Sequence, residues 1–286
     1  MMETLKLIEC PRDAIQGYPL SIPTTLKIEY YQMLLEVGFD TLDCGSFVSA
    51  KAIPQMADTP EVIRALDIGN TNTKILTIVA NLRGATEAVR YDNIHYLGYP
   101  FSVSENFQVR NTGKTIAESL TVLKEIYELT LAHDKELVVY LSMGFGNPYG
   151  DPWSPEIIKE WVNELATLGI KIISLSDTVG SAKPEAIQLL FSTLKTNYAQ
   201  IEFGAHFHAL PDQWYEKIHT AYLAGCTRFD GSIKGRGGCP MASDELVGNI
   251  PTEKLISYFS AHKSLPESIN GLHFESAYNF SHKLFI

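Results

Sequence analysis

Two histidines stand one residue apart in the sequence EFGAHFHALP, which runs from Glu202 to Pro211. Side chains of a β-strand alternate between its two faces, so His206 and His208 point to the same side if this stretch is a strand. Two neutral imidazoles aimed at one point are typical of a metal site, although many internal histidines are only hydrogen-bonded core residues. The metal interpretation therefore depends on which other residues reach the same point.

An arginine and an aspartate stand side by side early in the chain, in the sequence LIECPRDAIQ. Neighbours on a strand point to opposite faces, so Arg12 and Asp13 can serve one site only if the chain turns at this place. Pro11 favours such a turn, because it fixes its own backbone and restricts that of Cys10. The alternative is an ordinary surface ion pair, which is worth less than about 1 kcal/mol.

Four further residues could take part in chemistry. Asp43 and Asp177 could each act as a catalytic carboxylate. Each could equally be a helix cap, a salt-bridge partner or a turn residue, since aspartate is common in all of these places. Tyr140 falls within a predicted strand. Cys239 lies in the glycine-rich sequence GRGGCPMASDELVGN, where we do not expect an ordinary core thiol. A thiol on a mobile loop is a candidate proton donor, since a nearby cation lowers its pKa from about 8.5.

The elements that must position these residues follow a regular order. Short β-branched or aliphatic runs alternate with segments of helical period, and they form eight pairs. The predicted strands cover residues 5–10, 41–45, 75–80, 94–98, 137–142, 171–175, 201–207 and 227–233. The predicted helices cover residues 24–37, 60–66, 84–90, 114–132, 154–168, 184–197, 213–224 and 252–262.

Eight strand–helix pairs without a linker predict an α/β fold, a closed (β/α)₈ TIM barrel that forms a single catalytic domain over residues 1–264. Residues 265–286 show no clear period, and we expect them to form a short C-terminal extension packed on the barrel. A doubly wound open sheet is the alternative. An open sheet gathers its functional residues at one switch point, whereas the candidates here follow several different strands, which favours the barrel.

In a barrel, inward residues of alternate strands share a layer, so the end of the first strand can reach the same point as the seventh. Asp13 is therefore a plausible third ligand beside His206 and His208. Such a nitrogen and oxygen site suits Mg²⁺, Mn²⁺ or Co²⁺ that holds a substrate through two oxygens. Zn²⁺ is less favoured, because no thiolate is among these ligands.

Composition limits the partners of the protein. The formal net charge of −10 over 286 residues argues against nucleic acid or an anionic membrane. No apolar run reaches the length of about eighteen residues that a membrane span needs, and no targeting segment is evident, so we expect a cytoplasmic protein. The four cysteines are far apart and are expected to be reduced thiols. A homodimer is left open.

Several segments resemble one family of enzymes. LIECPRDAIQ resembles the strand-one signature of metal-dependent carbon–carbon lyases and condensing enzymes that are built on a TIM barrel. GSFVSAKAIPQMAD, residues 45–58, is similar to a segment of hydroxymethylglutaryl-CoA lyases, and GGCP followed by GN resembles the cysteine-containing loop of that family. The resemblance covers about residues 5–260.

The resemblance implies an acyl-CoA substrate, a divalent cation, Mg²⁺ or Mn²⁺, and cleavage of 3-hydroxy-3-methylglutaryl-CoA to acetoacetate and acetyl-CoA. A related lyase, aldolase or condensing enzyme for another 3-hydroxyacyl-CoA or 2-oxo acid is the alternative. A metal-binding protein on the same barrel without catalytic activity is the third interpretation.

The resemblance also implies roles for individual residues. Arg12 would stabilise the enolate oxygen, Cys239 would move protons, and His206 or Asp43 would take the hydroxyl proton. Asp43, Tyr140 and Asp177 would occupy further active-site positions. The implied metal ligands are Asp13, His206, His208 and Asn249.

This chain departs from the pattern of the family at four places. Asp43 stands where the family usually has Glu, and Ser176 replaces a common Gly. The loop from Cys239 to Asn249 is one residue longer. Ala209 follows the second histidine where Asp is usual, so support for the metal ligands must come from elsewhere in the chain.

Overall fold

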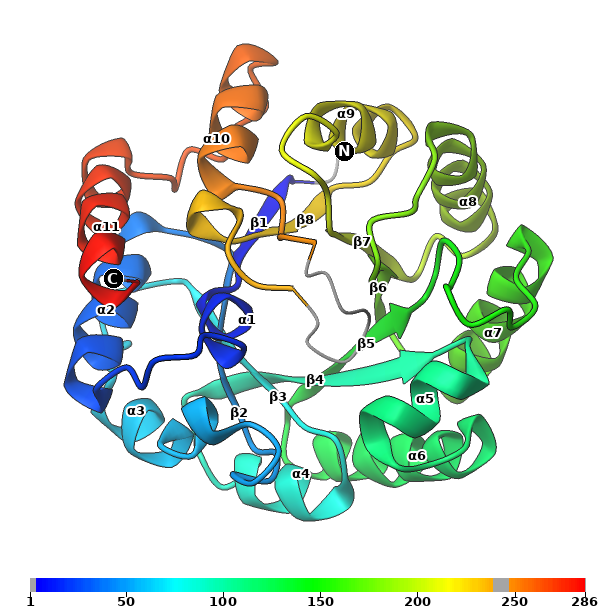
Figure 1. Cartoon of the computed structure of the whole chain (residues 1–286), viewed down its shortest axis with the longest axis horizontal. Coiled ribbons are helices and arrows are strands. Elements are labelled where there is room, and N and C mark those ends of the chain that lie inside the picture. The colour runs from blue at the N-terminus through cyan, green and yellow to red at the C-terminus, as the bar shows by residue number, and fades with distance from the viewer. Residues whose placement is uncertain (1–3, 239–246, 286) are drawn as a thin grey trace.

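Eight parallel strands close into a barrel, and helices surround it (Figure 1). The computed structural model describes residues 4–238 and 247–285. The TIM-barrel prediction is confirmed, and the open sheet is excluded because the first strand pairs with the eighth along Lys6–Glu9. The strands are β1 (Lys6–Glu9), β2 (Thr41–Ser46), β3 (Lys74–Ile78), β4 (Ile94–Ser102), β5 (Glu136–Ser142), β6 (Ile172–Asp177), β7 (Glu202–Phe207) and β8 (Arg228–Gly231).

Each predicted helix is present, with ends that shift by a few residues. The helix predicted from residue 114 begins at Ile116, because Thr115 and Glu118 form a reciprocal capping box in front of it. None of the described helices has the length and apolar character that a membrane span requires. These helices are α2 (Thr24–Val37), α3 (Thr59–Ala65), α4 (Leu82–Ala88), α6 (Ile116–Ala132), α7 (Pro155–Leu168), α8 (Pro184–Asn197), α9 (Trp214–Leu223) and α10 (Thr252–Ala261).

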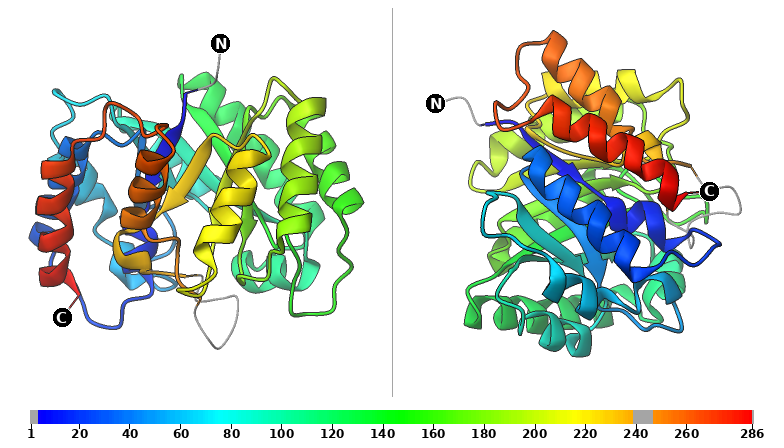
Figure 2. Two further views of the ribbon diagram at one scale, coloured as in Figure 1. Left: turned by 90° about the horizontal axis from the view of Figure 1, so that it is seen from above. Right: turned by 90° about the vertical axis from the view of Figure 1, so that its left-hand side faces the viewer.

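Five short or terminal elements were not expected. The C-terminal segment forms a helix that lies beside α2, as Figure 2 shows, with Phe280 stacked on Tyr30 at 6.2 Å between ring centroids. Its buried residues cluster in its second half, so its helical period is too short to be recognised from the sequence. The domain boundary after residue 264 stays a prediction. The unexpected elements are α1 (Pro11–Gln16), η1 (Pro54–Met56), α5 (Glu105–Thr112), η2 (Ile233–Gly235) and α11 (Gly271–Leu284).

The apolar core has two parts. The larger part fills the space between the strands and the outer helices. A smaller cluster fills the middle of the barrel lumen and is formed by Leu76, Tyr96, Val138, Tyr140 and Ile172. The lumen is therefore packed at its centre, and its charged residues gather at the two ends. The three described cysteines, Cys10, Cys44 and Cys226, are buried free thiols, in agreement with the prediction.

Candidate metal centre and active site

The structure brings Asp13, His206 and His208 together at the carboxyl end of the barrel. Each offers a ligand atom, and these atoms all lie within 4.8 Å of one another. Asp13 lies in α1, His206 lies in β7, and His208 is the residue that directly follows β7. Asp13 and His208 are 3% and 2% exposed, so a cation held between them would be largely shielded from water.

A turn at the end of β1 explains how Arg12 and Asp13 serve the same place. Pro11 begins α1, and the amide of Asp13 donates to the carbonyl of Cys10 at 3.1 Å. The strand thus becomes a helical turn, as Pro11 led us to expect. Both charged side chains are consequently buried at the carboxyl end of the lumen instead of pointing to opposite faces of a strand.

His206 is oriented by an aspartate that the sequence did not single out. Its Nδ1 lies 3.0 Å from Oδ2 of Asp230, which belongs to β8. Burial alone would lower the pKa of His206, but the hydrogen bond and charge of Asp230 outweigh it and raise that pKa. A carboxylate on Nδ1–H leaves the Nε2 lone pair of a neutral ring free to bind a cation.

His208 carries a buried nitrogen that has no partner. Its Nδ1 makes no hydrogen bond within the described part of the chain, although the atom is shielded from water. Burial, followed by the neighbouring His206, lowers the pKa of His208 to about 4. The ring is therefore neutral at pH 7, which is the form that ligates metals. A buried nitrogen of this kind is costly unless something binds it, so the residues present fit a divalent cation.

Asn249 lies beside the same group. His208 and Asn249 form an antiparallel bridge, and Nδ2 of Asn249 donates to Oδ2 of Asp13 at 2.7 Å. The same Nδ2 donates to the carbonyl of Arg236 at 2.8 Å. Asn249 therefore holds Asp13 in place in this structure, and its role as a metal ligand stays a prediction.

Arg12 is clamped between two carboxylates. Its Nε donates to both oxygens of Asp43, its Nη2 donates to Oδ2 of Asp43 at 2.5 Å, and its Nη1 donates to Oδ1 of Asp13 at 3.2 Å. Burial raises the pKa of Asp43 to about 6, although Arg12 opposes the rise. Burial would also raise the pKa of Asp13, but Arg12 and the two histidines outweigh it and lower that pKa. Asp43 thus positions Arg12 despite its short side chain.

The three ligand candidates and Arg12 face one cavity of about 280 Å³. Tyr140 also lines it, with its ring edge-on to His206 at 5.3 Å between centroids. The Oη atom of Tyr140 is buried and has no hydrogen-bond partner among the described residues. The lining also includes the apolar residues Val48, Ala52, Ile53, Ile78, Ala80, Pro100 and Phe107.

Asp177 does not line this cavity, and its expected place in the active site stays a prediction. Ser176 lines the cavity, and because strand residues alternate, Asp177 points outward to α9. There its Oδ2 accepts from Nζ of Lys217 at 2.6 Å. Lys217 also donates to the carbonyls of Gly180 at 2.8 Å and His208 at 3.0 Å. Asp177 and Lys217 form a buried ion pair that holds the backbone of His208.

Sequence reasoning missed Lys217 and Asp230. Lys217 is a buried cation on α9, and Asp230 is a buried acid in β8, whose sequence is Arg-Phe-Asp-Gly. A charged residue at a position that the pattern assigns to the core is the signal that could have marked both. Cys239 lies outside the described residues.

Comparison with known proteins agrees with this architecture. The family model described as HMGL-like matches residues 6–281. The mitochondrial hydroxymethylglutaryl-CoA lyase of Bos taurus is 32% identical over 93% of this chain and 81% of its own length. A structure of an HMG-CoA lyase from Acinetobacter baumannii in complex with coenzyme A and 3-methylmalate is 29% identical, with a TM-score of 0.90 over 99% of this chain and 91% of that one.

Another relative is named for two substrates. The 3-hydroxy-3-isohexenylglutaryl-CoA/hydroxy-methylglutaryl-CoA lyase of Pseudomonas aeruginosa is 29% identical over 88% of this chain and 83% of its own length.

Proposed function

Because the chain belongs to the HMGL-like family, we propose that it is a lyase that cleaves 3-hydroxy-3-methylglutaryl-CoA into acetoacetate and acetyl-CoA. The observation that carries this proposal is the convergence of Asp13, His206 and His208 with Arg12 at one cavity. Coenzyme A is bound in the similar structure from A. baumannii, which supports an acyl-CoA substrate.

Asp13, His206 and His208 would hold the cation, with Asn249 as a further candidate, and their donor set suits Mg²⁺ or Mn²⁺. When bound, a divalent cation would fix the tertiary hydroxyl and the carboxylate of the substrate and make the hydroxyl more acidic. Burial would raise the pKa of Asp13, but the charge of Arg12 opposes it and the pKa is lowered, so Asp13 is ionised and ready to bind a cation throughout the neutral pH range.

Cleavage begins when the hydroxyl proton leaves. His206 and Asp43 are the candidate acceptors. Asp230 stabilises a protonated His206 ring, which favours His206, but a neutral imidazole has one free lone pair, so a His206 ring that holds the cation cannot take the proton. While His206 is a metal ligand, Asp43 is therefore the acceptor, although both of its oxygens accept from Arg12.

Arg12 would stabilise the charge that develops next. As the carbon–carbon bond breaks, its electron pair moves into the thioester and forms the enolate of acetyl-CoA. The guanidinium of Arg12 is fixed by Asp43 and Asp13 at the edge of the cavity. A fixed cation in a water-poor pocket stabilises an oxyanion more strongly than water does, because it needs no reorganisation.

Cys239 would finish the reaction by giving its proton to the enolate carbon. We expect Cys239→Ala to reduce kcat much more than it changes KM, because the donor acts after the substrate is bound. Steady-state kinetics of the variant and the wild type provide the measurement. An unchanged kcat would remove Cys239 from the mechanism.

One assay tests the function directly. The purified protein is incubated with Mg²⁺ or Mn²⁺ and hydroxymethylglutaryl-CoA, and acetoacetate is measured. We expect acetoacetate and acetyl-CoA in equal amounts. If this substrate is not cleaved while another 3-hydroxyacyl-CoA is, the chain is a related lyase. Metal binding without cleavage of any acyl-CoA would contradict lyase activity altogether.

The apolar residues that line the cavity favour a second candidate substrate. Seven of the lining residues are apolar, so the cavity could receive a longer alkyl group than a methyl group at the 3-position. The relative from P. aeruginosa is named for such a substrate. A higher kcat/KM for an analogue with a longer alkyl group than for hydroxymethylglutaryl-CoA would establish this alternative.

A further inference from the structure

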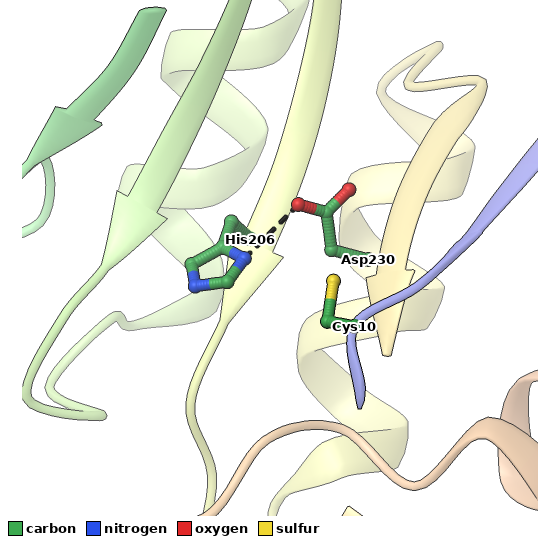
Figure 3. A group of neighbouring side chains, drawn as sticks. All are labelled: Cys10, His206 and Asp230. Carbon is green, nitrogen blue, oxygen red and sulfur yellow. Dashed lines mark hydrogen bonds and ion pairs between the residues drawn. The ribbon is translucent and has the colours of Figure 1, made fainter. Parts of the chain in front are cut away.

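A second group of ligand-type side chains lies in the lumen next to the proposed metal centre. Cys10, His206 and Asp230 come from the ends of β1, β7 and β8, and Figure 3 shows them converging. Their ligand atoms all lie within 4.8 Å of one another. Cys10 and Asp230 are 1% and 2% exposed, and His206 is partly buried.

The hydrogen bonds of this group are incomplete. Oδ1 of Asp230 is buried and has no partner in the described part of the protein, and neither does Oη of the adjacent Tyr140. The thiol of Cys10 has only a long contact of 4.0 Å to the carbonyl of Ile8. An unpaired buried polar atom costs about 1–3 kcal/mol, so two of them beside a thiol indicate a place where something binds.

The ligand atoms of this second group differ from those of Asp13, His206 and His208, which we call the Asp13 group. A thiol sulfur, an imidazole nitrogen and a carboxylate oxygen form a set that favours Zn²⁺ or Cd²⁺ over Mg²⁺. The 3.0 Å between Nδ1 of His206 and Oδ2 of Asp230 is near the separation of about 3.3 Å that two ligands at about 2.0 Å from a tetrahedral ion adopt. Only the sulfur must approach further.

His206 belongs to both groups and can serve only one at a time. Nδ1 faces Asp230, and Figure 3 shows the other ring nitrogen pointing away from Asp230 and Cys10. A neutral ring has one free lone pair. If Nδ1 binds an ion, the ring proton must sit on Nε2, and the Asp13 group then loses a ligand. The thiol proton of Cys10 leaves to solvent.

We propose that Cys10, Asp230 and Nδ1 of His206 form a second metal site, which takes thiophilic divalent ions such as Zn²⁺ and Cd²⁺ and inhibits the enzyme by capturing His206. The inhibition rests on the proposed role of His206 in the catalytic site. The binding itself does not, because it is a property of the three side chains.

Cadmium binding tests the site without any substrate. Chelator-treated protein is titrated with Cd²⁺, and the ultraviolet sulfur-to-cadmium charge-transfer band is recorded. The band should saturate in the wild type, persist in Cys239→Ser and disappear in Cys10→Ser. Cys226→Ser is the matched control, because that buried thiol contacts the carbonyl of Arg228 at 3.2 Å and belongs to no described ligand group. It should keep the band.

Inhibition provides the second readout. The Cd²⁺ concentration that halves the turnover of the Mn²⁺-loaded enzyme should rise roughly tenfold or more in Cys10→Ser, and its uninhibited turnover should be unchanged. A band that is equal in Cys10→Ser and wild type, or absent from the wild type, overturns the site. If Cys10→Ser does not fold, X-ray absorption at the cadmium edge is measured on the Cd²⁺-loaded wild type and on Cys239→Ser. The site requires one sulfur ligand on cadmium in both proteins, and its absence from Cys239→Ser overturns the site.

The two proposals fail separately. Loss of the band in an enzyme that cleaves hydroxymethylglutaryl-CoA overturns only the second site. A Cys10-dependent band in a protein that cleaves no acyl-CoA overturns only the proposed function.

Discussion

The two ends of the barrel lumen are both charged, but their charges are balanced differently. At the amino end, Nζ of Lys6 and Nη1 of Arg228 lie 2.5 and 3.0 Å from the carboxylate of Glu202. Asp40 lies 3.9 Å from the same guanidinium. This network, which we call the amino-end network, matches two cations with two carboxylates.

At the carboxyl end, three buried carboxylates face a single arginine. Asp13 and Asp43 pair with Arg12, and Asp230 pairs with His206. With both imidazoles neutral, these three carboxylates and Arg12 carry a net charge of −2, and Lys114 is a further, partly exposed cation on the described lining of the cavity. A divalent cation would cancel that negative charge, whereas the amino-end network needs none. The carboxyl end therefore carries buried negative charge that a cation would neutralise, whereas the charges of the amino-end network already balance one another.

Removing a ligand at the carboxyl end should have the largest effect. We expect His208→Ala to lower turnover by about a thousandfold or more and to weaken Mn²⁺ binding, because the Asp13 group then keeps only two donors. Calorimetric titration with Mn²⁺ and an acetoacetate assay check this expectation. If the variant binds Mn²⁺ with wild-type affinity, His208 is not a metal ligand, and the carboxyl end does not differ from the amino end in this respect.

Arg12→Gln should separate charge stabilisation from metal binding. The variant should slow cleavage by about 3 to 4 kcal/mol, since it removes the fixed cation that faces the enolate oxygen. Its Mn²⁺ affinity should not fall, because the excess of negative charge at the carboxyl end grows. The two quantities are kcat and the calorimetric dissociation constant. Equal losses in both would show that Arg12 only supports the metal ligands.

Lys217→Met tests the buried pair that holds His208. It leaves Asp177 buried without its cation and removes the donor to the carbonyl of His208, so we expect about 3 kcal/mol of lost stability and roughly tenfold weaker Mn²⁺ binding. Lys217→Met with Asp177→Leu is the control, because it removes the unpaired charge as well. Recovery of stability without recovery of Mn²⁺ affinity identifies Lys217 as a positioning residue; full Mn²⁺ affinity in the single variant argues against that role.

Glu202→Gln should affect stability alone. Glu202 is a quarter exposed, so we expect a loss of only about 1–2 kcal/mol, with unchanged kcat and Mn²⁺ affinity. Burial would raise the pKa of Glu202, but Arg228 and Lys6 outweigh it and lower that pKa. Its contribution is therefore present above its unfolded pKa near 4.5 and is lost as the pH falls through the folded value. Denaturation curves should converge with the wild type in acid and diverge at neutral pH.

The sequence predicted the barrel and the metal ligands for the same reason. Period-two and helical patterns indicate which face of each element is buried. The period of two predicted that His206 and His208 point to the same side, and Pro11 predicted the turn that brings Arg12 and Asp13 to one place. The pattern could not place Asp177, because every residue of β6 is buried and its two faces look alike in the sequence. The outward face of β6 is fixed only by the barrel as a whole.

The partners of the site residues were also beyond the pattern. Asp230 and Lys217 act across contacts between elements that are distant in the sequence, from β8 to β7 and from α9 to β6. A charged residue at a predicted core position indicates that a partner is needed but not which one. The family usually has Asp at position 209 to support the metal ligands, and this chain has Ala there. Only the three-dimensional structure shows that Asp230 and Lys217 support His206 and His208 instead.

The most direct test of the central claim is to add Mn²⁺ back to chelator-treated protein and measure acetoacetate release from hydroxymethylglutaryl-CoA. We predict no release before metal is added and a rate that saturates at about one Mn²⁺ per chain. An undiminished rate in the presence of EDTA would show that turnover does not depend on a metal at Asp13, His206 and His208.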